Sequence, residues 1–137
     1  MKRRGTAVWE GPGREGKGHL STQSGALKEM RYSHASRFKD EPGTNPEELI
    51  AAAHAGCFTM KLSILLQDAG FTAQQLQTES TVTIESGTIL SSVIQMHAQV
   101  PGISKEDFEG FVRDAEKNCP VSKVLNAEIS VDYTLNA

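Results

Sequence analysis

The chain has 137 residues and a formal net charge of -3, with 23% charged and 38% hydrophobic residues. This composition is typical of one globular domain over residues 1–137 rather than of a disordered chain. Acidic residues (17) outnumber basic ones (14), which argues against nucleic-acid binding because such proteins usually carry a basic excess. No apolar signal core follows the basic N-terminus, and His54 and Lys61 interrupt the most apolar stretch. We therefore expect a cytoplasmic protein with no membrane contact.

The first third of the chain is predicted to form a strand, a hairpin and a long loop. Residues 5–10 are typical of a strand, and residues 19–22 and 26–28 of a hairpin that turns at residues 23–25. The polar, irregular residues 29–43 predict a loop, and a loop of that length in a compact domain is often functional.

A helix is predicted over residues 45–68, the clearest such signal in the chain. Asn45 suits the N-cap and Pro46 the first helical position. Glu47 and Glu48 place negative charge in the first turn, where the helix dipole favours it. Apolar residues occur on almost all sides of this helix, so we expect it to be central and buried.

The second half is predicted to contain two alternating strands, two helices and a last strand. Period-two alternation over residues 76–85 and 90–100, with Leu90 facing inward, indicates an antiparallel sheet with one solvated face. Ser104 is expected to open a helix, and Pro120 a short one with Cys119 at its N-terminus. Residues 129–135 are predicted to form the last strand. The predicted class is α+β, with antiparallel sheets around a central buried helix.

Two cysteines, Cys57 and Cys119, stand far apart in the sequence and form no C-x-x-C pair. A permanent disulfide is not expected in a reducing cytosol. Inert buried thiols, metal ligands and a reactive pair that meets in the fold all remain open. A thiol at a helix N-terminus has a lowered pKa, so local physics favours Cys119 as the better nucleophile.

A thiolate in an apolar pocket needs a cation beside it, and a guanidinium held by a carboxylate suits that task. Each charged candidate could instead have no catalytic role: an arginine could be a solvated surface charge, and a glutamate could simply compensate the helix dipole. The candidate arginines and carboxylates are Arg14, Arg31, Arg37, Glu47 and Glu48.

Helix geometry constrains how such a site could be assembled. Ten residues of straight helix separate Glu47 from Cys57 by about 15 Å. Either the helix breaks near Gly56, or the glutamate and arginine come from a second subunit. We favour the second explanation, which predicts a dimer with shared sites.

Four segments resemble the OsmC/Ohr family of osmotically inducible and organic hydroperoxide resistance proteins. They are Arg37-Phe38, residues 43–50 (GTNPEELI), residues 52–58 (AAHAGCF) and residues 119–122 (CPVS). Residues 7–11 and 21–25 fit the OsmC branch more closely than the Ohr branch. The resemblance covers nearly the whole chain. It implies a thiol-dependent peroxidase for oxidative and osmotic stress defence, folded as an intertwined α+β homodimer with active sites at the subunit interface.

The resemblance also implies roles for the cysteines, contrary to the local argument. Cys57 matches the peroxidatic cysteine, which attacks the hydroperoxide and becomes a sulfenic acid, and Cys119 matches the resolving cysteine, which forms a disulfide with it. An external dithiol such as dihydrolipoamide would reduce the pair, with no bound cofactor or metal. An apolar pocket should favour organic hydroperoxides over hydrogen peroxide.

For the charged residues, the family resemblance leaves two candidates for the catalytic arginine. Arg37 matches the catalytic arginine of the OsmC branch, and Glu47, with Glu48 adjacent, matches the glutamate that orients it. The Ohr branch takes its arginine from an N-terminal glycine-rich loop, where this chain has Arg14 between Gly13 and Glu15. Arg14 is therefore the alternative catalytic arginine.

Other classes of function remain open. His54 and Cys57 lie three positions apart on one helix, and Cys119 could supply a third ligand to Zn²⁺. A redox sensor or ligand-binding module could use the same disulfide without turnover. A dimeric scaffold with two inert thiols is the third alternative.

Overall fold

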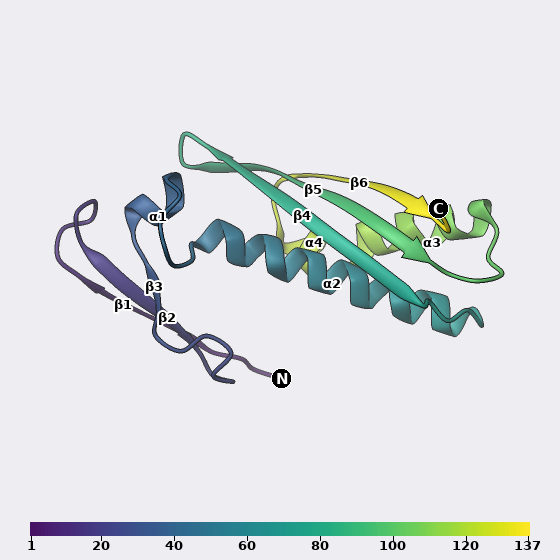
Figure 1. Ribbon diagram of the computed structural model, residues 1–137, viewed down its shortest axis with the longest axis horizontal. Coiled ribbons are helices and arrows are strands. Elements are labelled where there is room, and N and C mark those ends of the chain that lie inside the picture. Colours follow the sequence, from purple (N-terminus) through teal and green to yellow (C-terminus); the bar gives the residue numbers. More distant parts are fainter. The chain divides into compact units, whose positions relative to one another are not determined.

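The computed structural model describes all residues from 1 to 137 and divides into two compact units, residues 1–49 and residues 50–137. Each unit contains a three-stranded sheet, and helices accompany both (Figure 1). The predicted α+β class is therefore confirmed.

The sheet of residues 1–49 has the order β1-β2-β3, with both pairs antiparallel. Its strands are β1 (Gly5–Glu10), β2 (Lys17–Thr22) and β3 (Met30–Tyr32), and helix α1 (His34–Phe38) follows. The strand predicted over residues 5–10 is confirmed. The partner of β2, however, is β3 and not residues 26–28, and the loop predicted over residues 29–43 contains β3 and α1.

The wide turn after β2 explains the first difference. The Leu27 N–H donates to Thr22 Oγ1 at 3.0 Å, and the Glu29 N–H donates to Ser21 Oγ at 2.9 Å. Glu29 has a positive φ of 50°, so the turn extends through residue 29. The ladder with β2 therefore restarts only at Met30, which pairs with Leu20.

Helix α2 (Pro46–Asp68) begins as its sequence predicts. The Asn45 side chain accepts a hydrogen bond from the Glu48 N–H at 2.8 Å, which identifies Asn45 as the N-cap. The helix ends before Gly70, which has a positive φ of 89°. It is continuous through Gly56, so the helix break considered above does not occur.

The second sheet comprises β4 (Gln75–Glu85), β5 (Thr88–Gln99) and β6 (Glu128–Leu135), in that order. β4 and β5 are antiparallel, but β5 and β6 are parallel, so the prediction of purely antiparallel sheets is wrong. Helices α3 (Lys105–Asn118) and α4 (Pro120–Val124) connect β5 to β6, and a crossover of this kind returns the chain in the same direction. Figure 1 shows α2, α3 and α4 on one side of this sheet.

A β-bulge alters the start of β5. The pairing passes from Thr83 with Ser91 to Ile84 with Ile89, which leaves Leu90 as the extra residue. Leu90 is exposed, contrary to its predicted inward orientation. The alternation predicted for the rest of the strand is confirmed by buried Ile94, Met96 and Ala98.

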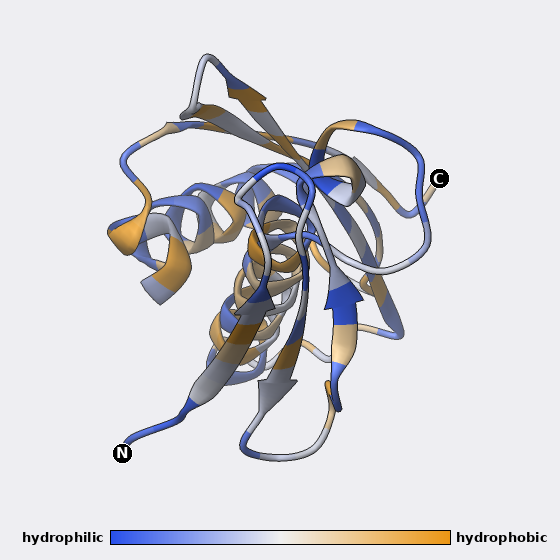
Figure 2. Ribbon diagram, turned by 90° about the vertical axis from the view of Figure 1, so that its left-hand side faces the viewer, coloured by the Kyte–Doolittle hydropathy of each residue, from blue (hydrophilic) through white to orange (hydrophobic).

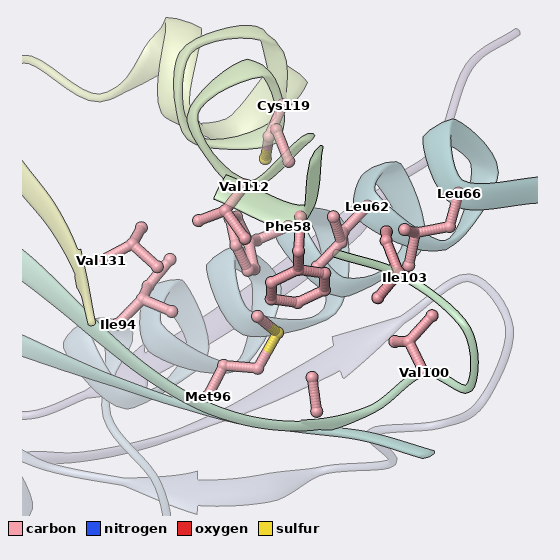
Figure 3. Packing of buried hydrophobic residues seen from close by; sticks show 13 residues of the cluster. Phe58, Leu62, Leu66, Ile94, Met96, Val100, Ile103, Val112, Cys119 and Val131 are labelled. Atoms are coloured by element: carbon pink, nitrogen blue, oxygen red, sulfur yellow. The ribbon is translucent and has the colours of Figure 1, made fainter. Parts of the chain in front are cut away.

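The hydrophobic core of residues 50–137 lies between the sheet and the three helices (Figure 3). Helix α2 contributes Phe58, Leu62 and Leu66 at four-residue spacing, all fully buried. Its other sides also carry hydrophobic residues (Figure 2), yet Met60 is 67% exposed and Ile64 47% exposed. The prediction of a buried helix therefore applies to one face, because the sheet covers only that face. By length and composition alone α2 could also cross a membrane, as core helices of soluble proteins can.

Candidate active site

The two cysteines come together at the N-terminus of α4. Cys57 lies on α2, half-buried, and packs against the core cluster. Cys119 is fully buried within that cluster and is the residue at which α3 ends and α4 begins (Figure 3). The predicted start of a short helix at Pro120 is thus confirmed. Both thiols are free.

Burial raises the pKa of the Cys57 thiol, and the side chain of Cys119 beside it raises this pKa further. The backbone N–H of Val121 and the charge of Lys61 act in the opposite direction. Val121 lies in the first turn of α4. The N-terminus of this helix, which was expected to lower the pKa of Cys119, therefore lowers that of Cys57. The spacing of Lys61, one turn after Cys57, could have revealed its role, whereas that of Val121 depends on the tertiary fold.

Arg37 and Glu47 form an ion pair within residues 1–49. Arg37 Nε donates to Glu47 Oε1 at 2.9 Å and to Oε2 at 3.1 Å, and Nη2 also donates to Oε1. The arginine side chain is 38% exposed and the glutamate side chain only 10%. Hydrogen bonding to Glu47 raises the pKa of Arg37. Burial, the largest single influence, raises the pKa of Glu47. The hydrogen bonds from Arg37, a backbone hydrogen bond and the charge of Arg37 together outweigh it, so the net pKa lies below its ordinary value.

Hydrogen bonds around the loop between α1 and α2 hold this pair in place. Ser36 Oγ donates to the Thr44 carbonyl at 3.0 Å, and Asn45 Nδ2 donates to the Ser36 carbonyl at 3.1 Å. Thr44 Oγ1 donates to Glu48 Oε2 at 2.7 Å. The structure therefore brings Glu47 to Arg37, while Glu48 binds the loop instead.

Arg37 also lines a cavity of about 230 Å³ within residues 1–49. The other lining residues are mainly aromatic or apolar: Trp9, Gly13, Tyr32, Ser33, His34 and Pro46. Gly13 precedes the alternative arginine, Arg14, whose own side chain does not line the cavity. Arg31 holds the loop through its carbonyl, which accepts the Thr44 N–H at 2.9 Å.

His54 is fully buried and both of its ring nitrogens are hydrogen-bonded. Nδ1 lies 2.6 Å from Ser92 Oγ, and Nε2 lies 2.8 Å from Ser122 Oγ. These bonds do not fit the zinc alternative, in which a ring nitrogen would face the metal. The described residues contain no group of three or more His, Cys, Asp or Glu side chains arranged to hold a metal ion.

Comparison with known proteins identifies the class. A family model described as "OsmC-like protein" matches residues 38–134. The chain is 44% identical to Peroxiredoxin OsmC of Escherichia coli over 141 aligned positions, covering 100% of this chain and 99% of the relative. It is 29% identical to the organic hydroperoxide resistance protein-like 1 of Staphylococcus saprophyticus, covering 86% of each.

The fold agrees with these relatives. An organic hydroperoxide resistance protein from Elizabethkingia anophelis, solved with thiocyanate bound, superposes with a TM-score of 0.75 at 25% identity, covering 99% of this chain and 97% of that one. The chain belongs to the OsmC family. The predicted family is thereby confirmed, and with it the predicted class of enzyme, a thiol-dependent peroxidase, and its soluble character.

Proposed function

We propose that this chain reduces organic hydroperoxides through Cys57 and Cys119. The Cys57 thiolate attacks the terminal oxygen of ROOH and the O–O bond breaks. The transferred hydroxyl makes Cys57 a sulfenic acid, and the departing alkoxide takes a proton from water and leaves as the alcohol ROH. Cys119 then forms a disulfide with Cys57, and its proton leaves with the sulfenic hydroxyl as water. An external dithiol, for example dihydrolipoamide, restores both thiols. The observation that carries this proposal is the placement of both thiols at the N-terminus of α4.

Cys57 suits the attacking role because it is the more accessible thiol, whereas Cys119 is fully buried. Its raised pKa means that a further cation is needed to favour the thiolate. The Arg37 guanidinium, oriented by Glu47, is the proposed cation. Its Nη1 group makes no hydrogen bond within the chain and can therefore contact a thiolate or a peroxide.

We place Arg37 and Cys57 in one site through a homodimer, with the arginine from the second copy. Helix α2 is unbroken, so about 15 Å of helix rise separates Glu47 from Cys57 within one chain. The outer face of α2, with Gly56, Met60 and Ile64, borders a groove of about 610 Å³. A backbone could approach closely at Gly56, since a Cβ atom built there meets nothing within 4 Å.

The cavity beside Arg37 supports an organic substrate. Trp9, Tyr32 and Pro46 offer apolar surface for the organic group, while the guanidinium offers a hydrogen-bond donor for the peroxide oxygens. Hydrogen peroxide would leave the apolar surface unused. We further propose that residues 1–137 act as one OsmC-like domain in the cytoplasm.

A thiol titration with intact mass spectrometry tests the reaction. Reduced protein receives one equivalent of cumene hydroperoxide or, in parallel, hydrogen peroxide. We expect rapid loss of both thiols within one chain, faster with the organic peroxide. Survival of both thiols would overturn the proposal, and oxidation without steady-state turnover in the presence of a dithiol would instead indicate a redox sensor.

A further inference from the structure

A chain of polar side chains crosses the core of residues 50–137, and the mechanism above does not use it. His54 and Ser92 are fully buried, and Ser122 is 8% exposed. Ser80 Oγ lies 2.9 Å from Ser92 Oγ, which extends the chain of hydrogen bonds beyond His54. No buried side-chain nitrogen or oxygen in the molecule lacks a hydrogen-bond partner, so the network is complete. Complete buried networks fix the relative positions of the elements that they join.

The hydrogen bonds can form with a neutral imidazole. Burial lowers the pKa of His54, and no charged group contributes to the shift. A neutral ring donates from one nitrogen and accepts at the other, and a serine hydroxyl can do either. The bond between Nε2 and Ser122 therefore forms in both tautomers.

The hydrogen bond between His54 and Ser122 joins two residues that each lie close to one of the cysteines in the sequence. His54 lies one turn before Cys57 on α2, and Ser122 lies three residues after Cys119, in α4. Among the hydrogen bonds between two side chains, this one alone joins α2 to α4. The bond to Ser92, by contrast, joins α2 to β5, which carries no cysteine.

We propose that His54 is a positioning residue for disulfide formation: through Ser122 it holds α4, and Cys119 with it, against the part of α2 that carries Cys57. This inference rests on the proposed roles of the cysteines. In the step concerned, the Cys57 sulfenic acid and the Cys119 thiol form the S–S bond and release water. Its rate depends on how often the two sulfur atoms meet in the correct orientation. Attack of Cys57 on the peroxide depends on α4 only through the Val121 N–H, which lowers the pKa of Cys57, so that first step should depend on Ser122 less than disulfide formation does.

Two serine variants separate positioning from a general loss of stability. Ser122→Ala removes the bond from His54 to α4, and Ser92→Ala removes the bond to β5 from the same ring. Each reduced variant receives one equivalent of cumene hydroperoxide, and mass spectrometry follows sulfenic acid, trapped with dimedone, and disulfide. With Ser122→Ala we expect disulfide about tenfold more slowly, the scale of one lost hydrogen bond, and a clearly smaller change in the rate of sulfenic acid formation. Ser92→Ala should change neither rate appreciably.

A second pair of variants tests the same role if Ser122→Ala does not fold. Ser122→Thr and Ser122→Val have nearly the same volume and differ in the hydroxyl, so the threonine variant should form the disulfide faster than the valine variant. Equal disulfide rates in that pair, or equal effects of Ser122→Ala and Ser92→Ala, would overturn the positioning role alone. Wild-type protein that keeps both thiols would overturn the proposed function, and this inference with it.

Discussion

The two units of the chain differ in what they bury. Residues 50–137 enclose a hydrophobic core that includes Phe58, Leu62 and Phe108. Residues 1–49 bury no hydrophobic side chain, and their buried residues are Ser36, Thr44 and Glu47. Several of their larger apolar side chains are exposed, namely Met1, Val8, Met30 and Phe38, while others such as Trp9 and Leu20 are half-buried.

This difference shows that the two units are ordered by different forces. A three-stranded sheet needs a packed apolar face for independent stability. Covering one large apolar side chain contributes about 1.5–3 kcal/mol, so residues 1–49 would gain much from a second copy. Within the unit, hydrogen bonds around the loop between α1 and α2 fix the one ion pair that the proposed chemistry requires. The unit that holds the thiols is built by burial, and the unit that holds the arginine is built by polar contacts.

The largest expected effect falls on the unit that holds the thiols. Cys57→Ser should abolish peroxide turnover, because the attacking sulfur is lost. Cys119→Ser should still reduce one equivalent of peroxide and then stop as a sulfenic acid, measured by dimedone labelling. If Cys119→Ser loses the first reaction while Cys57→Ser keeps it, the roles are reversed and the helix-terminus argument for Cys119 was right.

Loss of the ion pair between Arg37 and Glu47 should be the next largest effect. Arg37→Ala should lower the rate of thiol oxidation about 10²-fold, the usual loss for one electrostatic stabiliser. The control is Arg14→Ala, which removes the alternative arginine and should leave the rate nearly unchanged. The reverse result would transfer the role to Arg14.

A mixing experiment tests whether the site is shared between copies. Cys57→Ser chains, which should be inactive alone, and Arg37→Ala chains, which should be nearly so, are unfolded and refolded together. A shared site predicts recovery of roughly a quarter of wild-type activity, since half of the dimers are mixed and each mixed dimer has one intact site. No recovery, with mixed dimers verified by mass, would exclude a shared site.

Gly43→Ala should damage residues 1–49 without touching the ion pair directly. Gly43 has a φ of 114°, and a Cβ atom there would lie 2.3 Å from the Arg31 carbonyl oxygen. We expect an unfolding cost above about 2 kcal/mol and a rate that falls towards that of Arg37→Ala. Gly25→Ala is the matched control, because Gly25 also has a positive φ but open space around it. It should cost about 1 kcal/mol and leave the rate intact. Equal effects of both variants on the rate would show that the loop does not position Arg37.

Features that depend on neighbouring residues could be predicted from the sequence. The Asn45 cap and the Ser104 cap both follow from local chemistry and are confirmed. Helix α1 was missed because its cap is a reciprocal pair of serines, Ser33 with Ser36, rather than the usual pairing with Glu or Gln.

Features that depend on distant residues could not be predicted in this way. The parallel pairing of β6 follows from a crossover whose direction local alternation does not specify. The partners of His54 stand 38 and 68 positions away, so no local pattern indicates them. The proposed roles of Cys57 and Cys119 came from the family resemblance, and local reasoning alone favoured the other assignment.

The smallest expected effect concerns pH and again distinguishes the two units. Because burial lowers the pKa of His54, the unfolded chain binds a proton below about pH 6.5 that the folded chain does not. The stability is therefore complete above that pH and should fall as the pH drops below it, by at most about 1.4 kcal/mol per pH unit. Urea unfolding between pH 7.5 and 5.5 measures the slope, which His54→Gln should reduce and His97→Gln, at an exposed site, should not. If His54→Gln left this slope unchanged, a group other than His54 would cause the pH dependence of stability in the core that holds both thiols.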